Sequence, residues 1–411
     1  MLVSIRKDHR VLSLAAKLPD EEELLQLRRE RFFCPVCHQP VRLKYGSKKR
    51  AHFAHYPNSQ CRVESEPESE RHLAGKADLY GWALRKGRHA ELEYYFKLLR
   101  QRPDILLTGI EPMVIEYQCS AIAEEILCSR TKGYLGRGIT PVWVLGNNHY
   151  QQKGGRMKLS GFETAAIQYE SGSCSSDGDP FVSFYSLCFY DPANKQFIFS
   201  AHLSPCSKTS FISQEIVSPL DQVQPFQLLH PHFPQALERK LFKQKWLTVK
   251  KRQRLFFHRF RGMEEDWLRK QAYQLQHQPA YFPPYAGIPH EHFIWLQNPP
   301  YLWQTWVVYL LQEAAKDGLS PEQIIQLTKL RGGERLFLLR HLPLVRPIEL
   351  RRLLEIYLDQ LVSLQIVFKH DDRYLFRGRD IDQYRSLSRL FEQDKELLNA
   401  LDRQHLPISR K

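Results

Sequence analysis

The spacing of apolar and polar positions predicts alternating helices and strands in the first half of the chain. Apolar residues recur at helical intervals from Leu73 to Leu84, and Ser69 stands where the capping residue of a helix is expected. Two short apolar runs follow, separated by a turn that contains Gly109 and Pro112, which is the pattern of neighbouring strands. The predicted elements are a helix over 68–86, strands over 105–107 and 112–115, a helix over 122–134 and a strand over 141–146.

The second half of the chain is predicted to be mainly helical. A stretch rich in Ser, Gly and Asp over 171–180 marks a loop or boundary, and a capping box with proline at the first helical position begins at Ser320. Near the end, a helix followed by a hairpin around 370–372 is similar to a winged-helix module, which would grip DNA or a protein. The predicted elements are strands over 181–189 and 197–202, helices over 320–329 and 347–362, and strands over 364–368 and 374–376.

Charge favours a large anionic partner over a small neutral ligand. The 411 residues include 59 Lys or Arg and 45 Asp or Glu, so the formal net charge is +14. Nucleic acid is the natural candidate for such a basic chain. Residues 239–261 hold ten Lys or Arg and no acid, interleaved with aromatic residues. That segment suits either a helix that follows a phosphate backbone or an amphipathic helix with a buried aromatic stripe.

Cysteine usage and apolar content indicate the compartment. Of the eight cysteines, three belong to a candidate zinc motif described below, and the other five are an odd remainder without disulfide-like spacing, which fits a reducing environment. The N-terminal residues lack the long apolar core of a signal peptide, and no stretch of about 18 apolar residues is present to cross a membrane.

The segment 103–118 carries the strongest indication of chemistry. Asp104 precedes one predicted strand, and Glu116 and Gln118 share a face of the next because side chains alternate along a strand. Converging carboxylates repel each other unless a cation lies between them, and Mg²⁺ prefers such oxygen ligands. We therefore predict that Asp104 and Glu116 hold Mg²⁺ or Mn²⁺ and that Gln118 positions the attacking water. The alternative is a hairpin with two exposed acids.

The predicted helix before this segment adds candidates. His72 and Lys76 share one face, and Glu70, within a turn of them, is the acid expected to assist at the metal, with Glu68 as its alternate. The competing explanation is a solvated, charged first turn that the helix dipole favours.

A second motif has the spacing of zinc ligands. A Cys-x-x-Cys pair is followed by two histidines and a further cysteine, a pattern that supplies four tetrahedral ligands. His52 and His55 would face opposite ways on a strand, so only one is expected to bind. The favoured structural zinc site is Cys34, Cys37, His55 and Cys61, with His52 as the alternate. Reduced buried thiols beside surface histidines are the simpler alternative.

These motifs together resemble a known family. The strings RPDILL and IEYQ resemble the PD-(D/E)xK nuclease core, with glutamine in place of the motif lysine. With CPVCHQPVRLKYGSKKRAHFAH, ESERHLAGK and PVWVLG they are similar to the competence protein CoiA-like family over at least residues 30–150. The resemblance implies a cytoplasmic bacterial protein of natural transformation that acts where incoming single-stranded DNA is processed and recombined. It also implies that Arg130 and Tyr134 lie beside the nuclease site.

The predicted fold class is α/β (α+β) with three domains. They are a zinc-ribbon-like module over 1–62, a restriction-endonuclease-like mixed-sheet domain over 63–170, and a C-terminal region over 171–411 with a hairpin and a helical part that ends in a winged-helix candidate. The leading hypothesis is a metal-dependent deoxyribonuclease acting on single-stranded or branched DNA. The alternatives are a catalytically silent DNA-binding adaptor that recruits recombination proteins, and a zinc-bearing RNA-binding protein. The sequence leaves the oligomeric state open.

Overall fold

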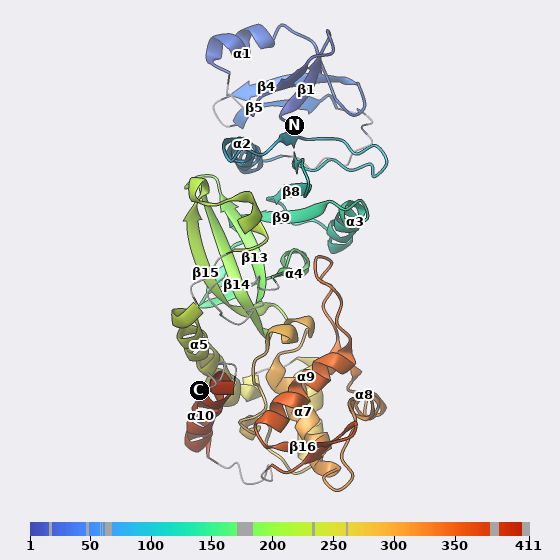
Figure 1. Cartoon of the computed structure of the whole chain (residues 1–411), viewed down its shortest axis with the longest axis vertical. Coiled ribbons are helices and arrows are strands. Elements are labelled where there is room, and N and C mark those ends of the chain that lie inside the picture. Colours follow the sequence, from blue (N-terminus) through green and yellow to red (C-terminus); the bar gives the residue numbers. More distant parts are fainter. Residues whose placement is uncertain are drawn as a thin grey trace.

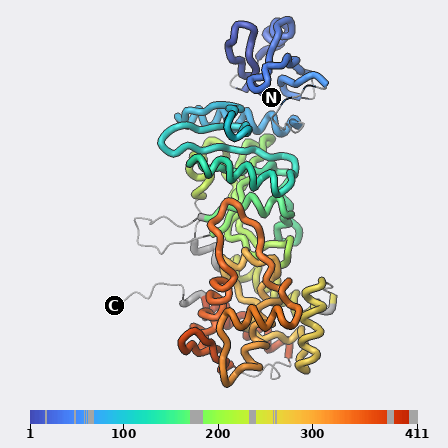
Figure 2. The backbone as a smooth tube through the Cα atoms, turned by 90° about the vertical axis from the view of Figure 1, so that its right-hand side faces the viewer, coloured from blue at the N-terminus to red at the C-terminus, as the bar shows by residue number. Residues whose placement is uncertain are grey.

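The computed structural model is elongated, with three regions stacked along its long axis (Figure 1). It describes residues 1–15, 19–46, 49–57, 59, 61, 68–170, 184–231, 235–259, 262–378 and 386–404. A small N-terminal sheet lies at one end, a large mixed sheet lies in the middle, and a helical region lies at the other end (Figures 1 and 2).

The N-terminal region is an antiparallel sheet in the order β2-β1-β3-β4-β5. Phe32 and Phe53 pack against each other in its core, with ring centroids 4.9 Å apart. An acidic first turn and an Asp20 capping box begin its helix α1. The elements are β1 Val3–Arg6, β2 Val11–Ser13, α1 Glu21–Leu27, β3 Phe32–Phe33, β4 Pro40–Gly46 and β5 Lys49–His55.

The central sheet is mixed, as predicted. Its strands follow the order β10-β11-β15-β14-β13-β9-β8-β7-β6, and β12 pairs with β13. The pairs β8–β9 and β9–β13 are parallel, and the other pairs are antiparallel. The strands are β6 Ala90–Leu92, β7 Ile105–Leu107, β8 Met113–Gln118, β9 Thr140–Gly146, β10 Gln152–Lys153, β11 Arg156–Lys158, β12 Gln168–Glu170, β13 Phe184–Asp191, β14 Gln196–Ser207 and β15 Ser210–Pro219.

This sheet extends beyond the domain boundary predicted at residue 170. Strand β13 pairs in parallel with β9, and β14 and β15 continue from it, so residues 184–219 belong to the same sheet as the predicted nuclease-like strands. The sequence predicts a hairpin here but not its partner strand, because pairing between distant segments leaves no local pattern. The predicted strand residues 181–183 lie outside the described part of the chain.

Helices pack beside the central sheet at β8. The helices of this region are α2 Glu70–Arg85, α3 Glu124–Leu135 and α4 Gly161–Ala165, with 3₁₀ turns η1 Asn147–His149, η2 Leu220–Gln222 and η3 Pro225–Leu228. All six residues of β8 are buried. Ser69 caps α2 through the His72 N–H, as predicted. The ring of Tyr117 fits beside α2 at Gly75, and Tyr134 of α3 reaches Glu116 on the same strand.

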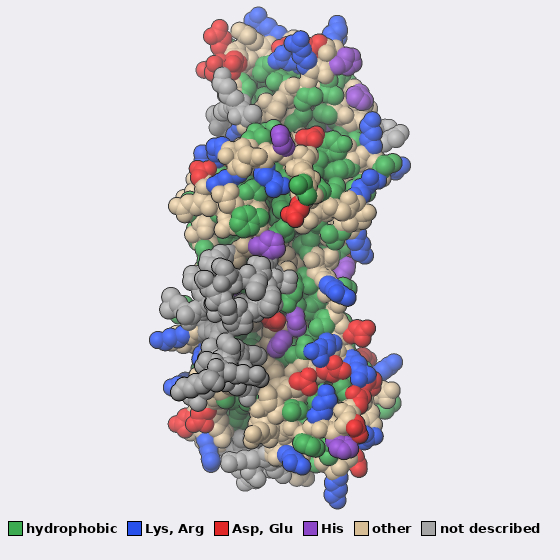
Figure 3. Space-filling model, viewed as in Figure 1, with side chains coloured by type: hydrophobic (Ala, Val, Ile, Leu, Met, Phe, Trp, Pro, Cys, Tyr) green, Lys and Arg blue, Asp and Glu red, His purple; other side chains and the backbone are tan. Residues whose placement is uncertain are grey.

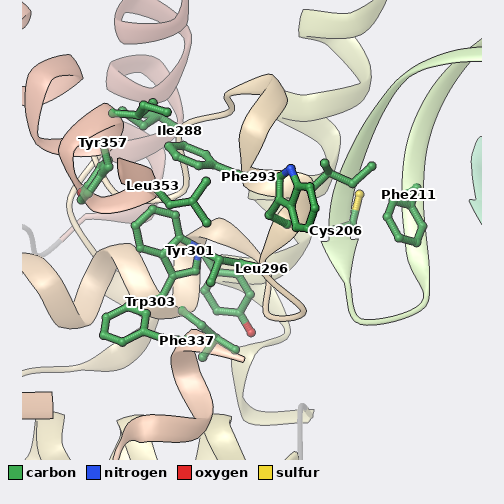
Figure 4. Packing of buried hydrophobic residues seen from close by; sticks show 14 of the residues in the cluster. Cys206, Phe211, Ile288, Phe293, Leu296, Tyr301, Trp303, Phe337, Leu353 and Tyr357 are labelled. Atoms are coloured by element: carbon green, nitrogen blue, oxygen red, sulfur yellow. The ribbon is translucent and has the colours of Figure 1, made fainter. Parts of the chain in front are cut away.

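The helical region is built around α7, whose residues 300–311 are all buried. Trp303, Phe293 and Tyr357 pack edge to face there (Figure 4). The same core includes Cys206 and Phe211 of the central sheet, so the two regions share one apolar interior. The elements are α5 Gln235–Leu255, η4 Phe257–Arg259, α6 Met263–Gln274, η5 Pro279–Tyr281, η6 Glu291–Trp295, α7 Pro300–Glu313, α8 Pro321–Leu330, η7 Glu334–Phe337, α9 Leu350–Ser363, β16 Val367–His370, β17 Arg373–Phe376 and α10 Leu387–Gln404.

Basic side chains of α5 and of the C-terminal hairpin contact other parts of the protein. In α5, Lys250 and Arg254 are buried and both pair with Asp394 of α10. In the predicted hairpin, now β16–β17, Lys369 lies over the Tyr374 ring and Arg373 donates to the carbonyl groups of residues 317 and 318. On the face in Figure 3, basic and acidic side chains are mixed over the helical end.

None of the helices, in the part of the chain that the structure describes, is long and apolar enough to cross a bilayer.

The contact between α2 and β8 predicts an unequal effect of two glycine substitutions. A Cβ at Gly75 would lie 2.2 Å from the Tyr117 ring, whereas a Cβ at Gly81 would meet only the end of the flexible Arg85 side chain. We expect Gly75→Ala to destabilise the protein by about 1–3 kcal/mol through overpacking. Gly81→Ala should be neutral or stabilise by about 0.5–1 kcal/mol, because glycine is a poor helix former. Thermal unfolding of both variants measures this, and equal melting temperatures would contradict the packing at β8.

Candidate metal centres and nuclease-like site

The first candidate centre lies in the N-terminal sheet. Cys34, Cys37, His55 and Cys61 each offer one ligand atom, and the four atoms all lie within 4.8 Å of one another. Three sulfurs and one ring nitrogen are a ligand set typical of a closed, structural zinc site. The structure thus brings together the four residues that the spacing predicted.

Local geometry explains how these ligands meet. Cys34 follows β3 and leads into a tight turn, in which the Val36 N–H lies 3.4 Å from the Cys34 sulfur. His55 ends β5, and its Nε2 atom lies 3.4 Å from the Cys37 sulfur. Burial first, and then the charges of neighbouring thiolates, raise the pKa of Cys34 to about 12. A bound cation would relieve this cost, since metal binding requires deprotonated thiols.

His52, the alternate ligand, lies elsewhere. Its Nδ1 atom is 2.9 Å from the carbonyl oxygen of Arg50, and it is not part of the four-residue cluster. The alternation of side chains along β5 accounts for the difference, since residues 52 and 55 are three positions apart.

The second candidate centre lies where α2 faces β7 and β8. Glu68, His72 and Asp104 offer ligand atoms that lie within 4.8 Å of one another. The His72 Nε2 atom is 3.2 Å from both Asp104 oxygens, and the backbone N–H of Tyr117 donates to Asp104 at 2.9 Å. Two carboxylates and an imidazole fit a divalent cation such as Mn²⁺ or Mg²⁺.

A buried ammonium group organises these acids. Lys76 is 1% exposed, and its Nζ atom contacts Glu68, lies 2.6 Å from Glu93 and lies 3.2 Å from Asp104. Burial acts against ionisation of Asp104, but Lys76 and then His72 outweigh it and hold the pKa of Asp104 well below its usual range. The same ammonium lowers the pKa of Glu93 to about 2 against the effect of burial.

Glu93 is a residue that the sequence analysis missed. It is 5% exposed and also accepts hydrogen bonds from the backbone N–H groups of Leu2 and Val3. It therefore joins the N-terminal sheet to the acidic centre. No local signal marks it, because its partners lie far away in the sequence.

Glu116 lies next to Asp104 but has a different set of partners. Its carboxylate accepts from Arg130 and from the Tyr134 hydroxyl, both at 2.5 Å, and from the backbone N–H of Asp104. Burial and the Asp104 charge raise the pKa of Glu116 to about 7, although Arg130 and Tyr134 act in the opposite direction. Lys76 lies beside Asp104 and Arg130 lies beside Glu116. The group of ligand atoms around Asp104 contains Glu68 and His72 and not Glu116, so the binding of one ion by Asp104 and Glu116 stays a prediction.

The three remaining predicted residues are Gln118, Glu70 and its alternate Glu68. Gln118 is buried at the end of β8, and its amide donates to the carbonyl group of Ser120 at 2.9 Å. Glu70 lies away from the centre, because its carboxylate accepts from the backbone N–H of Arg50 in β5. The structure places Glu68, the alternate, in the cluster with Asp104. The reason is that Glu68 precedes the Ser69 cap, so its direction is not set by the helix.

Comparison with known proteins identifies the family. The competence protein CoiA N-terminal domain matches residues 16–64, its nuclease-like domain matches residues 68–233, and its C-terminal domain matches residues 241–391. The chain belongs to the CoiA family of competence proteins. It is also 28% identical over 281 residues to "Competence protein CoiA" of Bacillus subtilis (strain 168), covering 68% of this chain and 71% of that protein. No solved structure matches.

The three matched family domains correspond to the three regions of the fold. The nuclease-like domain runs from before α2 to beyond β15, so it contains the acidic centre and the whole central sheet. The cysteine cluster lies in the N-terminal domain, and the C-terminal domain runs from within α5 to the first turn of α10.

The cysteine cluster predicts one metal ion in this CoiA-family chain. We expect metal analysis of the purified protein to find about one zinc per chain at this centre, and Cys34→Ser to lose it, because a zinc site needs its four ligands. Cys206→Ser is the matched control, since Cys206 is also buried but belongs to the core of the central sheet. Equal zinc in the Cys34→Ser variant and the wild type would refute the assignment.

Proposed function

We propose that this protein is a divalent-cation-dependent nuclease that processes DNA. The observation that carries the proposal is the group of Glu68, His72 and Asp104 ligand atoms beside the Glu116 carboxylate, within a nuclease-like domain. Asp104 and Glu116 would hold Mg²⁺ or Mn²⁺, with Glu68 and His72 completing the site. The cation, when bound, would polarise a phosphate oxygen and activate water.

The side chains around the cation have separate roles in this proposal. Arg130 and Tyr134 fix the Glu116 carboxylate, and Arg130 also stacks over the Trp143 ring, 5.6 Å from its centroid. Gln118 orients the attacking water through its amide, which carries no charge. Lys76 supplies the positive charge that the Glu116-x-Gln118 strand lacks, because its ammonium group lies 3.2 Å from Asp104.

The proposed substrate is single-stranded or branched DNA entering the cell in natural transformation. The net charge of +14 favours a polyanion, and the matched relative is named as a competence protein. Exposed cations such as Lys251 and Arg252 on α5 would contribute to DNA binding. Recombination proteins in the bacterial cytoplasm are the proposed protein partners.

A DNA-binding adaptor without catalysis is the second candidate, and one observation favours it. Lys76 and Arg130 already compensate the buried acids, as the short contacts to Asp104, Glu93 and Glu116 show. In an adaptor these ion pairs would replace the cation permanently. In a nuclease the carboxylates would have to share their charge between the cation and the basic side chains.

Substitution of Asp104 tests the catalytic proposal. Loss of a residue that only supports a metal ligand typically costs about 10–100-fold in activity. Because Asp104 is a proposed ligand itself, Asp104→Asn should reduce Mn²⁺-dependent cleavage of labelled DNA by a larger factor. DNA affinity, measured by fluorescence anisotropy, should stay close to that of the wild type. The control is Asp221→Asn, which alters an exposed carboxylate paired with Arg85. Cleavage that persists in Asp104→Asn would assign the activity to another site.

Substitution of Lys76 separates the nuclease from the adaptor. Lys76→Met leaves the buried Glu93 and the partly buried Glu68 and Asp104 without their ammonium partner, so we expect a loss of about 3–5 kcal/mol in the free energy of unfolding. If the centre binds a cation, Mn²⁺ should raise the melting temperature of this variant more than that of the wild type. An equal response of both proteins to Mn²⁺ would favour the adaptor. Lys86→Met, on a half-buried cation just after α2 that donates to the carbonyl group of Asp221 outside the acidic centre, is the control.

A further inference from the structure

A third cluster of metal-ligating side chains joins the nuclease-like domain to the C-terminal domain. The carboxylate of Glu124 and the sulfur of Cys128 lie on α3, and the imidazole of His341 lies in the segment that follows η7. Their ligand atoms are all within 4.8 Å of one another. In Figure 1 an orange loop rises from the helical region towards α3 and α4, and Figure 2 shows it beside the central region from a second side.

The separations within this cluster are those of a coordination shell. His341 Nδ1 lies 3.3 Å from the Cys128 sulfur and 3.2 Å from a Glu124 oxygen. Ligand atoms on a tetrahedral zinc ion, with bonds of about 2.0–2.3 Å, lie about 3.3–3.8 Å apart. The sulfur-to-nitrogen separation between Cys37 and His55 in the N-terminal cluster is similar, at 3.4 Å.

Hydrogen bonding alone explains this geometry poorly. The shortest contacts of His341 to Cys128 and to Glu124 both involve Nδ1, and its Nε2 atom lies farther from the sulfur, at 3.9 Å. A single N–H could serve both acceptors only as a bent, bifurcated hydrogen bond, which is weaker than a linear one. A Cys-His-acid catalytic triad fits less well, since it places the acid and the nucleophile on opposite ring nitrogens, whereas the shortest contacts of both groups are to Nδ1 here. A cation placed between the three atoms satisfies all of them.

The positions of the ligands are fixed by the fold. Glu124 and Cys128 are four residues apart on α3, so they lie on one face of the helix. His341 follows Arg340, whose buried guanidinium group donates to the carbonyl groups of Ser207, Lys208 and Gln297. The two sides of the cluster are therefore held independently of any metal.

We infer that Glu124, Cys128 and His341 bind a divalent transition-metal ion of the zinc class. One thiolate, one imidazole and one carboxylate suit Zn²⁺ or Co²⁺ better than Mg²⁺, because a soft thiolate is a poor ligand for Mg²⁺. His341 is 55% exposed, so solvent can supply the fourth ligand. The ion would link α3 to the C-terminal domain. Helix α3 also carries Arg130 of the nuclease-like centre.

Metal analysis and cobalt spectroscopy of the full chain test this site. After dialysis against excess Zn²⁺ and removal of free metal, the wild type should hold about one ion more than Cys128→Ser and about one more than His341→Ala. Both substitutions should also remove part of the thiolate-to-cobalt charge-transfer absorption of the Co²⁺-loaded protein. Added Zn²⁺ should raise the melting temperature of the wild type more than that of His341→Ala.

Matched variants keep the result specific to this cluster. Glu125→Gln changes the exposed neighbour of Glu124 and should retain the metal content of the wild type. Cys34→Ser should lose a different ion, so its combination with His341→Ala should lose both. Because His341 is exposed, its variant tests the site even if Cys128→Ser folds poorly. Equal metal content and equal cobalt spectra in the wild type and His341→Ala would overturn the inference.

Discussion

The nuclease-like centre depends on the ion pairs that the buried ammonium group of Lys76 makes with the surrounding acids. The ammonium group contacts acids from three segments of the chain: Glu68 before the cap of α2, Glu93 just after β6, and Asp104 just before β7. Such acids could not stay ionised together in a buried place without a cation among them. Glu93 also binds the backbone of residues 2 and 3, so the same network fixes the N-terminal sheet against the nuclease-like domain.

The centre has two halves with different electrostatics. Around Asp104, the basic groups outweigh the effect of burial, so this carboxylate stays charged over the physiological range. Around Glu116, burial outweighs Arg130 and Tyr134, and its pKa lies near neutrality. The main chain joins the halves, because the N–H of Asp104 donates to Glu116 and the N–H of Tyr117 donates to Asp104. A phosphate or a divalent cation would meet carboxylates that the backbone has already oriented.

The central sheet and the helical region pack directly against each other. Their apolar core is continuous, and Arg340 ties the segment after η7 to the turn between β14 and β15. The same segment brings His341 to α3, the helix that also carries Arg130 and Tyr134. The cluster at His341 thus lies at the point where movement of the C-terminal domain would reach the helix that holds Glu116.

The sequence by itself determined the local elements and most of the ligand types. Helical spacing and the Ser69 cap predicted α2, apolar runs predicted β7 to β9, and the Cys-x-x-Cys spacing with His55 predicted the first cluster. Only the tertiary structure decided that Glu68 rather than Glu70 lies beside Asp104, and that Glu93 contacts Lys76 in the same centre. It also decided the burial of Lys250 with Asp394 and the pairing of β13 with β9. Each of these depends on contacts between segments distant along the chain, which periodicity and motif spacing do not encode.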